Sequence, residues 1–201
     1  MKQCEVIKSI SYNQEDIINN ILTLYNKGNS IEFDPCYSVG GFYRSGEVVE
    51  PIIKSDIMPL LPGVEKFDVT DLPFENKFQS IIFDPPFLVK GGNSSYKMIE
   101  RFSCFNSLEA LLGFYKKSFI SLHRALKTRG LLILKTQDFV HARKNNIILP
   151  DIISMARDVG FKVVDLFILL SRSRIINIKN QQHARKYHSY FIVLKKLSSA
   201  R

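Results

Sequence analysis

The chain has 201 residues, of which 45% are hydrophobic, and this is enough for one domain with a substantial core. Its net charge of +9 fits either a generally basic surface or attraction to a polyanion. No apolar run is long enough for a membrane span, the N-terminus lacks a secretory signal, and the 3 scattered cysteines form no Cys-x-x-Cys pair. We therefore expect a cytoplasmic protein without a membrane partner, a disulfide framework or a metal site.

The first half of the chain is predicted to form one helix and several short strands. Residues 11–25 carry an apolar stripe at helical spacing, and Ser11 or Asn13 can cap this helix. Strands are predicted at 30–34, 51–55, 65–68 and 79–83. Residues 89–106 are irregular and polar, and they predict a mobile loop.

The second half alternates between helix and strand. Helices are predicted at 107–126 and 150–160, and strands at 131–135, 161–170 and 190–197. Such alternation predicts an α/β protein with a parallel sheet covered by helices. In open sheets of this kind, ligands bind beyond the carboxyl ends of the strands.

The most informative run is residues 81–87, where an apolar strand ends in Asp84 and Pro85, Pro86 and Phe87 follow. This run resembles motif IV of the amino-methyltransferases of the Asp-Pro-Pro-Tyr/Phe group, of compact phage or bacterial type, which act on nucleic-acid bases. Asp-Pro-Pro is also an ordinary turn at the end of a strand. Its place directly after a buried strand favours the catalytic interpretation.

The resemblance implies transfer of a methyl group from S-adenosylmethionine to an exocyclic amine. Asp84 and the Pro85 carbonyl would accept hydrogen bonds from that amine and draw its nitrogen towards tetrahedral geometry. The tandem proline, completed by Pro86, stiffens the turn, and Phe87 would stack on a base taken out of its helix. A cysteine nucleophile is disfavoured because no Pro-Cys follows the fourth strand.

A second similarity concerns the loop after the first predicted strand. Residues 33–43 are similar to motif I of the same family, usually Asp-Pro-Phe-x-Gly-x-Gly. Asp34-Pro35 and Gly40 line up with it, whereas Cys36 and Ser38 replace the usual Phe and Gly. Gly40-Gly41 still permits the close backbone approach that a ligand needs. On its own this run also reads as a loop with a capped turn.

Two further acids stand where the resemblance implies cofactor contacts. Asp56 follows the second predicted strand and is a candidate for the ribose hydroxyls or the amino group of the cofactor. Asp68 precedes a run, 71–74, that resembles the Asp-Leu-Pro-Phe of many such enzymes, and it is a candidate for the adenine amine. Either acid also suits a solvated turn. Tyr37 and Phe87 are candidates for the sulfonium side, although Tyr37 also suits the core.

Basic residues gather in two places. The first cluster follows the fifth strand, and the second fills the connection between the last two strands, which we expect on the cofactor side. The predicted nucleic-acid contacts are Lys135, Arg143, Lys144, Arg172, Arg174, Lys179, His183, Arg185 and Lys186. A solvated hairpin loop is the alternative. A metal site at His183 and His188 is rejected, because no carboxylate or cysteine joins them.

The resemblance implies a Rossmann-like class I methyltransferase fold, with a seven-stranded, mostly parallel sheet, helices on both faces and an antiparallel last strand. Residues 1–201 would form one domain, with a helical segment at 1–30, the core at 31–197 and a basic substrate-side hairpin at 171–189. No separate target-recognition domain is expected. A homodimer or a specificity partner stays open.

We therefore interpret the chain as an S-adenosylmethionine-dependent methyltransferase for adenine N6 in DNA. An RNA substrate, methylated at adenine N6 or guanine N2 as in small ribosomal-RNA methyltransferases, is the first alternative. The target base, cytosine included, is open. A non-catalytic nucleic-acid-binding module with a degenerate cofactor pocket is the second alternative, and Cys36 and Ser38 are its support.

Overall fold

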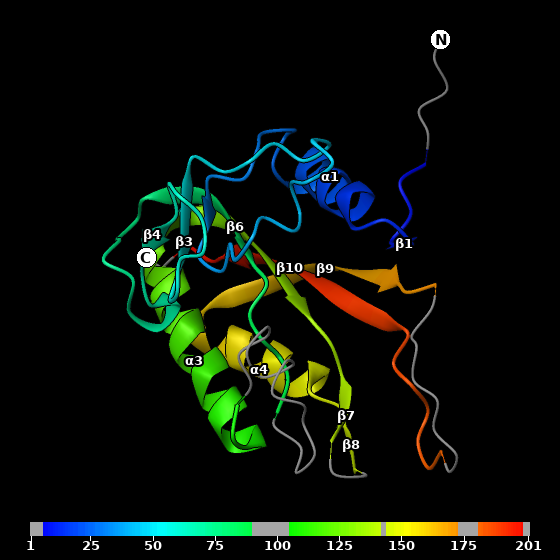
Figure 1. Ribbon diagram of the computed structural model, residues 1–201. Coiled ribbons are helices and arrows are strands. Elements are labelled where there is room, and N and C mark those ends of the chain that lie inside the picture. Colours follow the sequence, from blue (N-terminus) through cyan, green and yellow to red (C-terminus); the bar gives the residue numbers. More distant parts are fainter. Residues whose placement is uncertain (1–5, 90–104, 142–143, 173–180, 199–201) are drawn as a thin grey trace.

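The computed structural model describes residues 6–89, 105–141, 144–172 and 181–198, and its centre is one twisted sheet (Figure 1). The sheet has 8 strands in the order β1-β9-β10-β6-β5-β2-β3-β4. The strands are β1 Ile10–Ser11, β2 Phe33–Asp34, β3 Ile53–Asp56, β4 Glu65–Lys66, β5 Phe78–Phe83, β6 Leu126–Thr136, β9 Phe161–Leu170 and β10 His188–Lys196.

Neighbouring strands of the sheet are parallel except at β10, which runs antiparallel to both β6 and β9. The predicted antiparallel last strand is therefore confirmed. Since β9 runs in the same direction as β6, the carboxyl ends of β2, β3, β5, β6 and β9 lie along one edge, together with the beginning of β10. The connection between β9 and β10 leaves from this edge, as predicted.

Three helices cover the sheet in the described part of the chain. They are α1 Gln14–Tyr25, α3 Leu108–Ala125 and α4 Leu149–Val159. In Figure 1, α1 lies above the sheet and α3 and α4 lie below it. Asn13 caps α1 by accepting the Glu15 N–H, and Ser107 caps α3 by accepting the Ala110 N–H.

The two faces of the sheet bury two apolar clusters. On one face α3 and α4 pack their apolar stripes on the inward side chains of β5 and β6, with Phe119, Phe161 and Ile192 among the buried members. On the other face α1 packs Ile17 and Ile21 with a long irregular segment after β2. That second cluster holds the N-terminal helix firmly against the sheet.

The structure also differs from the predicted elements. The predicted helix start at Ser11 is wrong: Ile10–Ser11 forms the edge strand β1, which pairs with β9, so the sheet has one strand more than expected. The strand predicted from Leu131 begins at Leu126, and residues 128–130 form a bulge against β5. A short hairpin, β7 Phe139–His141 with β8 Lys144–Asn146, was also not predicted.

The predicted loop at 89–106 lies mostly outside the described residues. Its two ends are described, and they meet: Val89 and Phe105 form a β-bridge, and the Phe105 N–H donates to the Leu88 carbonyl over 2.9 Å. No helix in the described part of the chain combines the length and apolarity that crossing a membrane requires.

Candidate active site

Four acids gather at the carboxyl edge of the sheet. Asp34 and Asp56 end β2 and β3, Asp84 follows β5, and Asp68 comes shortly after β4. Burial, and after it the negative charge of all four carboxylates, raises the pKa of the Cys36 thiol well above its usual value. Parallel strands bring their carboxyl ends to one edge, so acids far apart in the sequence come together here.

Asp84 is the acid of the predicted catalytic turn. Its side chain is 28% exposed, and its Oδ2 atom lies 3.3 Å from the Lys135 ammonium. Burial raises the pKa of Asp84, while the charge and hydrogen bond of Lys135 oppose this shift. Its Oδ1 atom makes no hydrogen bond to a described residue and so remains an acceptor. Pro85, which follows, is buried.

Lys135 lies inside the site, although the sequence placed it in a basic surface cluster. Its ammonium is 3.4 Å from Gln14 Oε1 as well as beside Asp84, and it lies 4.9 Å from the centre of the Phe42 ring and 5.7 Å from that of Phe191. The side chain is only 17% exposed. A carboxylate, an amide oxygen and aromatic faces all favour a cation, so this lysine is held beside the turn that begins with Asp84.

An open cleft of about 580 Å³ adjoins the turn. Phe87 and Lys135 form part of its wall, together with the beginning of α1 and the ends of β9 and β10 that meet at this edge. The other lining residues are Tyr12, Asn13, Gln14, Glu15, Gln137, Leu169, Leu170, Ser171, Arg172, His188 and Ser189. The cleft is large enough for a nucleotide, and Phe87 offers it a ring.

Asp34 lies beneath the loop rather than on its surface. The side chain is 2% exposed, and its two oxygens accept hydrogen bonds from the Cys36 N–H at 3.0 Å and from the Tyr43 hydroxyl at 2.9 Å. Burial raises the pKa of Asp34 to about 7, against the effect of these two hydrogen bonds. Asp34 thus supports the loop from beneath, and its contact with a cofactor stays a prediction. Pro35, the next residue, is also buried.

The rest of the loop is shaped by Tyr37, which belongs to the core. Tyr37 stacks on Tyr43 with ring centres 5.5 Å apart, and its hydroxyl donates to Glu50 over 2.8 Å. Gly40 has φ +69°, and a Cβ there would stand 2.5 Å from the Tyr37 oxygen. Ser38 has φ 51°, the conformation that its usual Gly counterpart adopts readily. The loop therefore keeps a glycine-like path despite the substitution.

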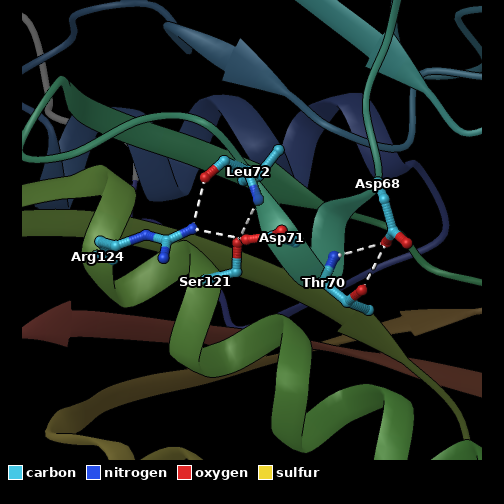
Figure 2. Close-up of polar contacts among 6 residues, drawn as sticks. All are labelled: Asp68, Thr70, Asp71, Leu72, Ser121 and Arg124. Carbon is cyan, nitrogen blue, oxygen red and sulfur yellow. Dashed lines mark hydrogen bonds and ion pairs between the residues drawn. The ribbon is translucent and has the colours of Figure 1, made fainter.

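Asp56 and Asp68 hold backbone groups around this loop. The Asp56 carboxylate accepts the N–H groups of Ser38 at 3.0 Å and Met58 at 2.9 Å. Asp68 is exposed and caps the short helix η1 Val69–Asp71, where its Oδ1 atom accepts from the Thr70 N–H and hydroxyl (Figure 2). A carboxylate oxygen accepts more than one hydrogen bond, so both acids can still bind a ligand.

The run at 71–74 is docked on α3. The Leu72 N–H donates to the Ser121 hydroxyl and the Leu72 carbonyl accepts from Arg124, as Figure 2 shows. Leu72 is fully buried, and Phe74 packs edge to face against Phe33. This docking positions Asp68 next to the strand ends.

The predicted nucleic-acid contacts are divided by the structure. Arg172 lines the cleft, with its guanidinium 5.3 Å from the centre of the Tyr12 ring. Lys144 is exposed at the start of β8. His183, Arg185 and Lys186 lie in the connection between β9 and β10, shortly before β10 begins. Arg143, Arg174 and Lys179 lie outside the described residues.

Several site residues were not found from the sequence. Gln14 links α1 to Lys135 and to the Gly41 carbonyl, and Tyr43 holds Asp34. Asp138 is linked through Tyr190 to His188, which the sequence had considered only as a rejected metal ligand. None of these residues belongs to a motif, and their roles depend on contacts across the fold.

No family model matches the chain, and no curated protein is similar to it. Solved structures are similar to it. TrmN from Thermus thermophilus has a TM-score of 0.54 and 15% identity, over 91% of this chain and 49% of that chain. An S-adenosylmethionine-dependent methyltransferase from Clostridium acetobutylicum has a TM-score of 0.55 and 12% identity, over 94% of this chain and 93% of that chain.

A third is 1,6-didemethyltoxoflavin-N1-methyltransferase from Burkholderia thailandensis, solved with S-adenosylhomocysteine, with a TM-score of 0.55 and 11% identity, over 93% of this chain and 80% of that chain. At these identities the likeness shows the fold, which is the Rossmann-like class I fold of S-adenosylmethionine-dependent methyltransferases. The [4+2]-cyclase SpnF shares this fold at a TM-score of 0.55 and 12% identity, over 91% of this chain and 81% of that chain. The reaction must therefore be argued from the site.

The chain is short beside some of these structures. It spans about half the length of TrmN and of TTHA0409, both from Thermus thermophilus, the second provisionally a DNA modification methylase. TTHA0409 has a TM-score of 0.44 and 17% identity, over 66% of this chain and 50% of that chain.

Proposed function

We propose that this protein is an S-adenosylmethionine-dependent methyltransferase that modifies the exocyclic amine of a nucleic-acid base, with adenine N6 in DNA as the first candidate. One observation carries the proposal. The Asp84-Pro85-Pro86-Phe87 turn stands at the carboxyl end of β5, with Asp84 among the acids of this edge and Phe87 on the wall of the adjoining cleft. An acceptor and a ring are thus side by side at the place where ligands of this fold bind.

The loop after β2 fits the proposed cofactor. Gly41 is exposed and a Cβ there would meet no atom within 4 Å, and Asp56 holds the path of the loop through Ser38. Asp56 is suited to ribose hydroxyls or the cofactor's amino group, and exposed Asp68 to the adenine amine. Asp34 and Tyr37 support the loop from within the fold. When bound, S-adenosylmethionine supplies an electrophilic methyl group.

The chain's own groups would prepare the nucleophile. Asp84 Oδ1 and the Pro85 carbonyl accept the two amine hydrogens, which turns the nitrogen lone pair out of conjugation with the ring. Lys135 binds Oδ2 and favours the ionised carboxylate, so Asp84 acts as an acceptor. Phe87 stacks on the base and holds it in line. Transfer would be direct: the new N–C bond would form as the S–C bond breaks, sulfur would keep the electron pair, and the positively charged nitrogen would then release one proton, to Asp84 or to water.

The proposal of a nucleic-acid substrate is supported by the cleft and by the positive charge of its surroundings. Lys135, Arg172 and His188 line it, and the connection between β9 and β10 adds Arg185 and Lys186 at the same edge of the sheet. We propose that the cleft takes a flipped nucleotide and that the basic connection holds the phosphate backbone. Small-molecule methylation leaves this charge unexplained.

The test is methyl transfer from labelled S-adenosylmethionine to duplex DNA, single-stranded DNA and ribosomal RNA in parallel. We expect label in DNA, loss of that label in Asp84→Ala, and cofactor affinity within about twofold of wild type in the variant. Hydrolysis to nucleosides then names the base. Label in RNA alone would move the substrate to RNA. Absence of cofactor binding would instead support a non-catalytic nucleic-acid-binding module.

A further inference from the structure

His188 is held in the cleft by its backbone as well as by its ring. It is the first residue of β10, and its carbonyl accepts a hydrogen bond of 2.6 Å from the Gln137 side chain. Its ring lies edge to face with Tyr190 at 5.0 Å, and its Nε2 atom is 2.8 Å from the Tyr190 hydroxyl. The imidazole therefore has a defined position in the wall of the cleft that Lys135 and Phe87 also line.

Asp138 determines which partner donates in the hydrogen bond between His188 and Tyr190. Asp138 is 5% exposed, and its Oδ1 atom accepts the N–H groups of Ile148 and Leu149 at the start of α4. Its Oδ2 atom accepts the Tyr190 hydroxyl at 3.0 Å. Burial, and then the charge of Asp138, raises the pKa of Tyr190 to about 12, so the hydroxyl keeps its proton at neutral pH.

The tautomer of His188 is a consequence of this chain. A tyrosine hydroxyl has one hydrogen, and Tyr190 donates it to Asp138. The Tyr190 oxygen must then accept from His188, which places the ring proton on Nε2 and the lone pair on Nδ1. Among the described residues nothing donates to Nδ1.

We propose that His188 Nδ1 is the fixed hydrogen-bond acceptor with which the cleft recognises an N–H or O–H group of the bound nucleotide. This inference rests on the proposed function, since it takes the cleft as a nucleotide site. Lys135 and Arg172, which also line the cleft, are donors only. Glu15 is a further acceptor there, but its side chain makes no hydrogen bond to a described residue, whereas the His188 imidazole is held by Tyr190 and, through Tyr190, by Asp138.

The donor has two possible sources on a nucleotide, and they share this chemistry. An edge of the base offers N–H groups in both DNA and RNA. A ribose 2′-hydroxyl offers an O–H group in RNA alone. The same acceptor would therefore read either the base or the sugar.

The experiment is NMR of protein labelled with ¹⁵N-histidine, titrated with adenosine, cytidine and guanosine monophosphates and with their 2′-deoxy forms. We expect the free protein to show His188 protonated on Nε2 and bare on Nδ1, and we expect a nucleotide to shift the Nδ1 resonance. His188→Ala should weaken that nucleotide's binding about fivefold, the worth of one neutral hydrogen bond. The internal control is His123 of α3, which packs edge to face on Phe161 and does not line the cleft, so its resonances should not move.

The titration also separates the two sources. A shift with ribonucleotides and deoxyribonucleotides alike, seen with both their 5′- and their 3′-monophosphates so that no one free sugar hydroxyl is common to all, assigns the donor to the base. A shift with ribonucleotides alone assigns it to the 2′-hydroxyl. Tyr190→Phe should lose the tautomer preference while the protein stays folded. A proton on Nδ1 in the free protein, or an Nδ1 resonance that no nucleotide moves, would overturn the inference. If Nδ1 responds but no substrate is methylated, the proposed reaction fails while the nucleotide site stands.

Discussion

The Lys135 ammonium and the Asp84 carboxylate form an ion pair of 3.3 Å at the end of two adjacent strands. In the register between β5 and β6, Phe83 pairs with Leu134, so the residues that follow them come together. The pair occupies one oxygen of Asp84, and the other makes no hydrogen bond to a described residue. A lysine that the sequence assigned to nucleic-acid binding thus becomes part of the candidate catalytic centre.

Replacement of this lysine should change the pH dependence of catalysis. Burial raises the pKa of Asp84 and Lys135 opposes that shift, so Lys135→Met should raise it further. Because the reaction needs the ionised acid, activity should then be lost at a higher pH as pH falls. We expect the acidic limb of kcat/KM to move up by about one pH unit or more. Lys135→Arg should keep the wild-type profile. If the acidic limb of Lys135→Met does not move, and the variant binds DNA more weakly and with less dependence on salt, Lys135 contacts phosphate and does not tune Asp84.

Asp34 should make stability depend on pH in an unusual direction. The folded carboxyl holds its proton up to about pH 7, whereas the ordinary value is 3.8. Between these values the folded state binds more protons than the unfolded state, so this group's contribution to stability falls as pH rises. Asp34→Asn cannot ionise, and above about pH 7 its free energy of unfolding should exceed that of wild type by about 4 kcal/mol, with the advantage vanishing near about pH 4.

Denaturant unfolding across this pH range measures the difference. Asp71→Asn is the control, because that side chain is 86% exposed and should leave the pH dependence as in wild type. A constant difference between Asp34→Asn and wild type at every pH would show that burial does not perturb Asp34.

Gly40 and Gly41, in the loop after β2, should respond differently to replacement by alanine. At Gly40 a Cβ would meet the Tyr37 hydroxyl at 2.5 Å, and the backbone has φ +69°. We expect Gly40→Ala to destabilise the fold by roughly 1–3 kcal/mol and to weaken S-adenosylmethionine binding. Gly41→Ala has no atom within 4 Å of the added carbon and should leave stability nearly unchanged. Equal effects in thermal unfolding would argue against the packing of Tyr37 under this loop.

Phe87 should contribute to nucleic-acid binding through its aromatic ring. Loss of the ring in Phe87→Ala should weaken nucleic-acid binding by about 1–3 kcal/mol, because a base would lose its stacking partner. Phe87→Tyr keeps the ring and should stay close to wild type. Fluorescence anisotropy with a labelled oligonucleotide measures both variants. A Phe87→Ala protein that binds normally but turns over slowly would assign Phe87 to the cofactor instead.

Arg172 should act on the backbone of the nucleic acid. It lines the cleft over Tyr12, where a guanidinium can reach a phosphate. Arg172→Gln should weaken binding to all sequences by a similar factor and reduce the salt dependence by about one ion. Lys116→Gln, on α3 away from the cleft, is the matched control. Sequence-selective loss in Arg172→Gln would point to base contact.

Much of the fold was predictable because its cause is local. Apolar patterns of strand or helix spacing located β5, α3, α4 and β9 to within a few residues. Asn13 and Ser107 mark the starts of α1 and α3 because their side chains cap these helices. The edge strand β1 escaped prediction because two residues carry no periodicity, and it forms only where β9 offers an open edge. Residues 128–130 were interpreted as a turn before the strand, because the irregular pairing of β6 with β5 at this point has no local sequence pattern.

The sequence by itself determined the residue types of the site. Asp84-Pro85-Pro86-Phe87 and the loop at 34–41 are contiguous, so their chemistry is visible without a fold. Only the tertiary structure decided which acid is buried and which cation is paired. Asp34 is enclosed by Tyr43, Lys135 is brought to Asp84, and Asp138 reaches His188 through Tyr190. These contacts depend on strand register and on packing between distant segments, and no local pattern in the chain encodes them.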